Sequence, residues 1–196
     1  MHKNRIKRRI IDEKILKRAA YHEAGHAVVW HINGFGVDEV SIGYAVDVKG
    51  ERAGGCHLIE PMIHYSYPGC YKKFKKQKKS FERYKKRADR LIDGLLAGPL
   101  AEKKMSKSRT PLYSNGVVSH GGKDDFIEAV CLAKEFYNDV QAGLYIHLTE
   151  VNIIKLLRRK NIWRAVTMLA EELLKKRTIE GDVLRKYLDD LPEYSG

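Results

Sequence analysis

The sequence predicts a mainly α-helical fold, a helical bundle with a small β-sheet beside its first long helix. Three observations favour this fold class. Apolar residues recur at helical spacing over residues 12–33 and again from residue 80 onward. Residues 37–42 alternate apolar and polar positions, as a half-buried strand does. Residues 144–188 divide into three amphipathic segments with short joints, which is typical of a helical bundle.

The domain boundaries follow from composition. Residues 1–11 form a basic leader, and residues 12–190 are expected to be a single domain, because 196 residues suffice for one domain with a real core. The first helix covers about residues 12–33, and Gly34 provides a stop signal at its C-terminal end.

A small sheet is expected directly after the first helix. Residues 37–42 predict one strand, which residues 44–48 either continue or pair with. Residues 49–55 are rich in glycine and charge and predict a turn, and residues 56–59 predict a second short strand.

The second half of the chain predicts helices joined by loops. The helix that starts near Ser80 runs into Pro99, which should kink or interrupt it. Residues 106–122 are rich in Ser, Gly, Asn and Pro and predict a loop. Residues 140–190 hold the C-terminal helices, and Thr178 is the expected N-cap of the last one.

Charge and composition indicate which partners and which cellular compartment to expect. The chain has a formal net charge of +12, and lysines interleave with aromatic residues at residues 71–79. That pattern suits nucleic acid or anionic lipid, although a solvated basic segment is the simpler interpretation. No apolar run approaches the roughly 20 residues of a membrane span, and the three cysteines include no Cys-x-x-Cys pair. We therefore expect a cytoplasmic protein with no transmembrane segment.

The most informative stretch is His22-Glu23-Ala24-Gly25-His26, in the middle of the first predicted helix. Residues four apart lie on one helical face, about 6 Å apart along the axis, so the two histidines can bind one zinc ion. Glu23 lies beside that metal, where it can take a proton from water and pass it to a leaving amine. The alternative is an ordinary amphipathic helix with two polar histidines.

A catalytic zinc site usually has three protein ligands and one open position for water. Asp125 and Asp124, which follow two glycines at a helix start, are candidates for the third ligand. Glu102 and, more weakly, His120 are the others. A carboxylate ranks first, because two histidines with one carboxylate are a standard hydrolytic zinc set.

These motifs, in this order, resemble the peptidase domain of the FtsH family, the membrane-bound AAA proteases. Residues 22–28 resemble the zinc motif of that family. Residues 96–102 resemble its glycine-rich stretch, and residues 121–126 resemble the start of the helix that carries its third zinc ligand. Residues 163–181 resemble its C-terminal helices, so that the resemblance covers about residues 15–188.

The resemblance implies an FtsH-peptidase-like helical bundle that holds Zn²⁺, with Glu23 as the catalytic residue. It places the third ligand on Asp125, with Asp124 one position away. Glu102 then becomes a group that orients a zinc-binding histidine, or the fallback ligand. Residues 71–90 become a basic insertion, where an anionic partner could bind.

The chain also departs from that family. It contains no Gly-x-x-x-x-Gly-Lys-Ser/Thr phosphate loop, so ATP-driven unfolding would have to come from a separate ATPase or adaptor partner. We therefore expect a zinc metalloendopeptidase that is ATP-independent by itself and hydrolyses unfolded or flexible protein segments. The alternative is a non-catalytic zinc-containing binding or regulatory module for nucleic acid or an acidic protein. The sequence does not indicate the oligomeric state.

Overall fold

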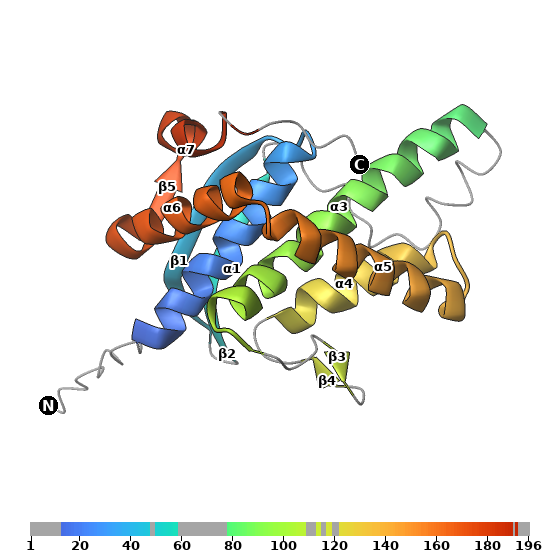
Figure 1. The fold of residues 1–196 in the computed structure, drawn as a ribbon, viewed down its shortest axis with the longest axis horizontal. Coiled ribbons are helices and arrows are strands. Elements are labelled where there is room, and N and C mark those ends of the chain that lie inside the picture. The colour runs from blue at the N-terminus through green and yellow to red at the C-terminus, as the bar shows by residue number, and fades with distance from the viewer. Residues whose placement is uncertain are drawn as a thin grey trace, which may run out of the picture.

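The computed structural model describes residues 13–47, 50–58, 78–108, 113–114, 117–118, 122–189 and 191. Within these residues the fold is mainly helical, with a small three-stranded antiparallel sheet, as the sequence predicts (Figure 1). No described helix is long and apolar enough to cross a bilayer. The helices are α1 (Glu13–Ile32), α3 (Lys78–Met105), α4 (Lys123–Lys134), α5 (Asp139–Leu157), α6 (Lys160–Lys176) and α7 (Gly181–Leu188). The strands are β1 (Val37–Asp47), β2 (Gly50–Leu58), β3 (Tyr113–Ser114), β4 (Val117–Val118) and β5 (Thr178–Glu180).

Helix α1 is the central element of the fold. It packs against α3, α6, β1 and β2, so that other elements surround it (Figure 1). Every residue from Ala19 to Trp30 is buried, including both histidines. A helix that is buried on all sides is a core helix rather than an amphipathic surface helix. The histidines therefore do not lie on a solvated face.

Helices α1 and α3 approach each other closely at Gly25. A Cβ atom at that position would lie 2.7 Å from the carbonyl oxygen of Ala97 and 2.7 Å from the Cβ of Ala101. Real Cβ atoms do not come so close, and both partners are themselves small residues. The backbones can therefore meet where a larger side chain would separate them. This contact brings Glu102 of α3 next to His22 of α1.

The sheet has the order β2-β1-β5, with both pairs antiparallel. Strand β1 runs on from the predicted residues 37–42 through Asp47. The turn predicted at residues 49–55 is wrong for residues 50–55, which belong to β2. Gly54 and Gly55 pair with Ile42 and Ser41 of β1. Pairing with a long neighbouring strand decides the conformation there, whereas glycine by composition alone indicates a turn.

Strand β5 forms where the sequence predicts the N-terminus of the last helix. Residues 178–180 form β5, and α7 begins at Gly181 with Glu180 as its N-cap, so Thr178 is not a cap. Ile179 is buried and pairs with Val40 of β1. Burial of this side chain and the added backbone hydrogen bonds outweigh the local capping signal, which depends on a single hydroxyl group.

Pro99 does not interrupt α3, which continues from Lys78 to Met105. The proline lacks one helical hydrogen bond donor, but the residues around it are locked by packing. Leu96 and Leu100 are both buried, and Gly122 lies so close that its Cβ would be 2.4 Å from the Cβ of Pro99. Tyr84 and Ala88, within the predicted basic insertion 71–90, are buried on α3 as well, whereas residues 71–77 lie outside the described residues.

Asp93 of α3 gives the fold a pH dependence. Burial raises the pKa of this carboxyl from 3.8 to about 6, aided by the charge of Asp89 and opposed by Asn33, whose amide donates a 3.1 Å hydrogen bond to it. The folded-state pKa lies above the unfolded value. Stability from this group is therefore present below pH 3.8 and is lost as the pH rises through about 6.

Replacing Asp93 with asparagine should therefore stabilise the protein at neutral pH. A pKa raised from 3.8 to about 6 corresponds to about 3 kcal/mol at most, and the amide oxygen of the introduced side chain can still accept the hydrogen bond. Urea unfolding at about pH 7.5 and pH 4 should show a gain at the higher pH and nearly none at the lower. A loss of stability at pH 7.5 would contradict this account of the Asp93 carboxyl.

Candidate metal centre

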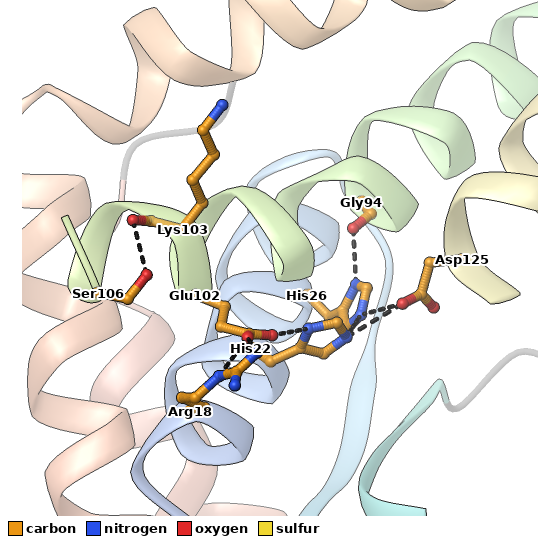
Figure 2. A network of polar contacts seen from close by, with 8 residues as sticks. All are labelled: Arg18, His22, His26, Gly94, Glu102, Lys103, Ser106 and Asp125. Carbon is orange, nitrogen blue, oxygen red and sulfur yellow. Dashed lines mark hydrogen bonds and ion pairs between the residues drawn. The ribbon is translucent and has the colours of Figure 1, made fainter. Parts of the chain in front are cut away.

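His22, His26 and Asp125 meet between α1 and α4, although the aspartate follows far along the chain. His22 Nε2 lies 3.0 Å from Asp125 Oδ2 and 3.0 Å from His26 Nε2. His26 Nε2 lies 3.6 Å from the same Asp125 oxygen, and Figure 2 shows the three groups directed toward one point. Ligands at about 2.1 Å from a tetrahedral zinc ion lie about 3.4 Å apart. The three residues could therefore hold one metal ion.

Helix α1 and its neighbours fix how the two histidines present their nitrogens. The rings lie 4.7 Å apart in an edge-to-face arrangement, as residues four apart on a helix can. His26 Nδ1 lies 2.7 Å from the carbonyl oxygen of Gly94. Since a carbonyl can only accept, Nδ1 carries the proton, and Nε2 is left with its lone pair for a metal. The ring also stacks on Trp30 at 5.0 Å.

Glu102 supports His22 from the opposite side of its ring. His22 Nδ1 lies 3.4 Å from Glu102 Oε2, whereas His22 Nε2 faces Asp125. Arg18 Nε donates a 2.6 Å hydrogen bond to Glu102 Oε1, and a second guanidinium nitrogen also contacts that oxygen. A carboxylate on the non-ligating nitrogen orients a metal-binding histidine and increases its basicity. Glu102 therefore occupies the orienting position (Figure 2).

The two aspartates at the start of α4 are placed differently. Asp125 is half-buried against the histidines, whereas Asp124 is exposed. The close contact of Gly122 with Pro99 holds the first turn of α4 against α3. Of the candidates for the third ligand within the described residues, Asp125 lies at the Nε2 atoms of both histidines, whereas Glu102 lies at Nδ1 of His22. His120 lies outside the described residues.

The electrostatics of the cluster suit a cation. Burial lowers the pKa of His22, but the hydrogen bond with Asp125, the contact with the Glu102 carboxylate and the charge of Glu23 outweigh it and raise the pKa to about 10. Burial raises the pKa of Asp125, yet the neighbouring His26 and His22 hold it well below its usual range. The cluster therefore binds a proton tightly between histidine and carboxylate. A divalent metal can take the place of that proton.

Glu23 is buried beside the first histidine, with 8% of its surface exposed. Its negative charge contributes to the raised pKa of His22. Burial raises the pKa of the Cys56 thiol of β2, and the charge of Glu23 raises it further. Glu23 therefore lies within electrostatic reach of both His22 and β2.

Three groups near the histidines are not among the site residues that the sequence predicts: the Gly94 carbonyl, Arg18 and Gly98. Arg18 is four residues before His22 and so shares its helical face, which is a usable signal. Gly94 and Gly98 stand four apart inside α3, and glycine in a helix interior often marks a close packing contact. A Cβ at Gly98 would lie 2.3 Å from His26 Nε2.

Replacing Gly98 with alanine should therefore displace the His26 ring and weaken metal binding by at least tenfold, the lower end of what disturbed ligand support costs, about 10–100-fold. Gly143→Ala is the matched control, since a Cβ there would meet nothing within 4 Å. It should keep metal affinity and gain up to about 1 kcal/mol of stability. Zinc titration by calorimetry and thermal unfolding give both readouts. Unchanged zinc affinity in Gly98→Ala would argue against His26 Nε2 as a ligand.

Comparison with known proteins leaves the family open. No protein-family model matches the sequence, and no curated protein matches it. The resemblance to the FtsH peptidase domain remains a prediction that rests on the motifs of the chain itself.

Proposed function

We propose that this protein is a zinc-dependent metalloendopeptidase similar to the FtsH peptidase domain. The observation that carries the proposal is the convergence of His22, His26 and Asp125 with a glutamate directly beside the first ligand. Two histidines and one carboxylate are a standard donor set of hydrolytic zinc sites. Three protein ligands leave a fourth position for water or substrate.

The burial of the ligands favours a catalytic site over a closed structural one. The side chains of His22 and His26 are 9% and 4% exposed, whereas that of Asp125 is 24% exposed. Access to the centre is therefore from the side of α4. Structural zinc sites are typically closed by four protein ligands, and a buried carboxylate such as Glu23 has no role in them.

Each residue has a distinct task in this mechanism. When bound, zinc would supply Lewis-acid polarisation of the peptide carbonyl and lower the pKa of water. Asp125 and the two histidines would hold the ion, and the Gly94 carbonyl keeps His26 in the tautomer that leaves Nε2 unprotonated. Glu102, held by Arg18, orients His22. Glu23 accepts the proton of the attacking water and delivers it to the leaving amine.

The sheet suggests how a substrate would lie. Strand β2 is an outer strand of the three-stranded sheet. The charge of Glu23 contributes to the raised pKa of the Cys56 thiol on this strand. An extended peptide that paired with the outer edge of β2 would bring its carbonyl groups toward the metal centre. Only unfolded or flexible segments can adopt that conformation, so a folded substrate would need a separate ATPase or adaptor to unfold it.

Metal removal tests the proposal. Treatment with 1,10-phenanthroline should abolish cleavage of an unfolded substrate such as casein, and stoichiometric zinc should restore it. Calcium, which prefers oxygen ligands, should not restore it. Cleavage that persists in the zinc-depleted protein would refute the proposed function, as would zinc-loaded protein that never cleaves unfolded chains.

A further inference from the structure

A cavity lies away from the candidate metal centre. It has a volume of about 420 Å³ and lies between the C-terminal ends of α3 and α5. Four cations line it: Lys103, Lys104 and Lys107 from α3 and its end, and Arg158 from the end of α5. Figure 2 shows Lys103 pointing away from the metal ligands, although its neighbour Glu102 supports His22. The cavity is therefore separate from the metal centre.

The charges around this cavity are unbalanced. Within the described part of the chain, no acidic residue lines it and none of the four cations has an ion pair with a carboxylate. Burial lowers the pKa of Lys104, and the adjacent charge of Arg158 lowers it further. Lys104 Nζ donates a hydrogen bond to the carbonyl oxygen of Leu157 and lies 3.9 Å from the centre of the Trp163 ring, and these two contacts hold it in place. An anion would relieve this repulsion.

The floor of the cavity is apolar. Leu100 and Leu157 are buried there, and Ile154 lies half-buried beside them. Cations at the rim and aliphatic side chains at the floor match a ligand that is charged at one end and apolar at the other. The volume falls within the range of small-molecule pockets, about 300–1,000 Å³.

Lys107 adds an independent observation. It adopts a positive φ of 53° at the end of α3, where Lys107 N and Ser108 N donate to the carbonyls of Lys104 and Lys103. Glycine normally occupies this position of a helix end, because a side chain there is strained. A lysine with a strained backbone conformation therefore lies at the rim of a cationic cavity. Backbone strain of this kind is often found at ligand sites.

We propose that this cavity binds a small amphiphilic anion, a phosphate or carboxylate group on a short aliphatic chain. The head group lies among Lys103, Lys107 and Arg158, and the tail lies against Ile154, with the buried Leu100 and Leu157 beneath it. Lysine and arginine make charge-assisted hydrogen bonds to such a head group, and burial of the chain adds the hydrophobic contribution.

Calorimetric titration with four probes tests the chemistry. Octyl phosphate and octanoate carry both features, inorganic phosphate lacks the tail, and octanol lacks the charge. One or both of the first two should bind saturably and at least tenfold more tightly than the last two, and the tighter one identifies the head group. If neither octyl phosphate nor octanoate binds saturably, or if octanol or inorganic phosphate binds equally well, the proposal is overturned.

Variants place the binding in this cavity. Lys107→Gly should weaken binding of the tighter probe by about tenfold and also raise the melting temperature, because it removes the head-group contact and the strain together. Arg158→Gln should weaken binding similarly. Lys175→Gln, which alters another lysine in the last turn of a helix, is the control and should bind normally.

A Lys107→Gly variant that is stabilised but binds normally would show that the lysine is only strained, and would refute the site. Zinc titration of the same variants separates this proposal from the peptidase proposal. The metal centre should be unchanged in all three, because none of them touches His22, His26 or Asp125. Loss of zinc binding in Lys107→Gly would contradict two separate sites.

Discussion

Replacing Glu23 with glutamine is expected to abolish peptide cleavage while zinc stays bound. Glutamine keeps the shape of the side chain but cannot accept a proton from the attacking water. General acid–base catalysis typically contributes about 10²–10⁴-fold, so cleavage should fall by that factor. The ligand atoms belong to other residues, and the zinc content should therefore remain at that of the parent protein.

The comparison needs three proteins purified in parallel. Parent, Glu23→Gln and Glu13→Gln should be tested on unfolded casein after zinc loading, with zinc measured by atomic absorption. Glu13 is an exposed glutamate at the start of the same helix, so its variant should cleave normally. Equal cleavage by Glu23→Gln would indicate a contaminating protease. Loss of zinc from Glu23→Gln would instead show that the carboxylate holds the metal.

Replacing Asp125 with asparagine is expected to remove most of the metal affinity. The variant loses the only carboxylate among the three candidate ligands, and with it the charge that balances the cation. Changes to groups that merely support a ligand already cost about 10–100-fold, so the loss here should exceed about 100-fold. Zinc should then no longer raise the melting temperature, because binding to the folded state is what stabilises it.

Asp124→Asn is a closely matched control. It makes the same chemical change one residue earlier, in the same first turn of α4, on an exposed side chain. Calorimetric zinc titration should leave Asp124→Asn like the parent. The opposite result, with weakened zinc binding in Asp124→Asn and normal binding in Asp125→Asn, would mean that Asp124 faces the histidines. It would contradict the position of α4 in the structure. Circular dichroism of both metal-free variants checks that α4 still forms.

Local patterns were sufficient for part of the candidate site. His22 and His26 converge because residues four apart share a helical face, which any stable helix guarantees. The mainly helical fold and the segment at residues 37–42 follow from periodicity in the same way. The partnership with Asp125 does not follow from periodicity. The resemblance to the FtsH family predicts it, and the contact between α1 and α4 supports it.

Long-range packing decided the rest. Pairing with β1 made strands of residues 50–55 and 178–180, where local signals favour a turn and a helix cap. Packing of the buried leucines around Pro99 kept α3 continuous. The Gly94 carbonyl reaches His26 only because glycines let α1 and α3 meet.

The sequence by itself therefore determined which helix carries the histidines, since helical geometry is local. Only the tertiary structure decided what surrounds them: Asp125, the support from Glu102, and the cationic cavity beyond α3. Those contacts join residues that are distant along the chain. Burial and close packing of whole helices and strands stabilise these contacts, and a short stretch of sequence does not reveal such long-range packing.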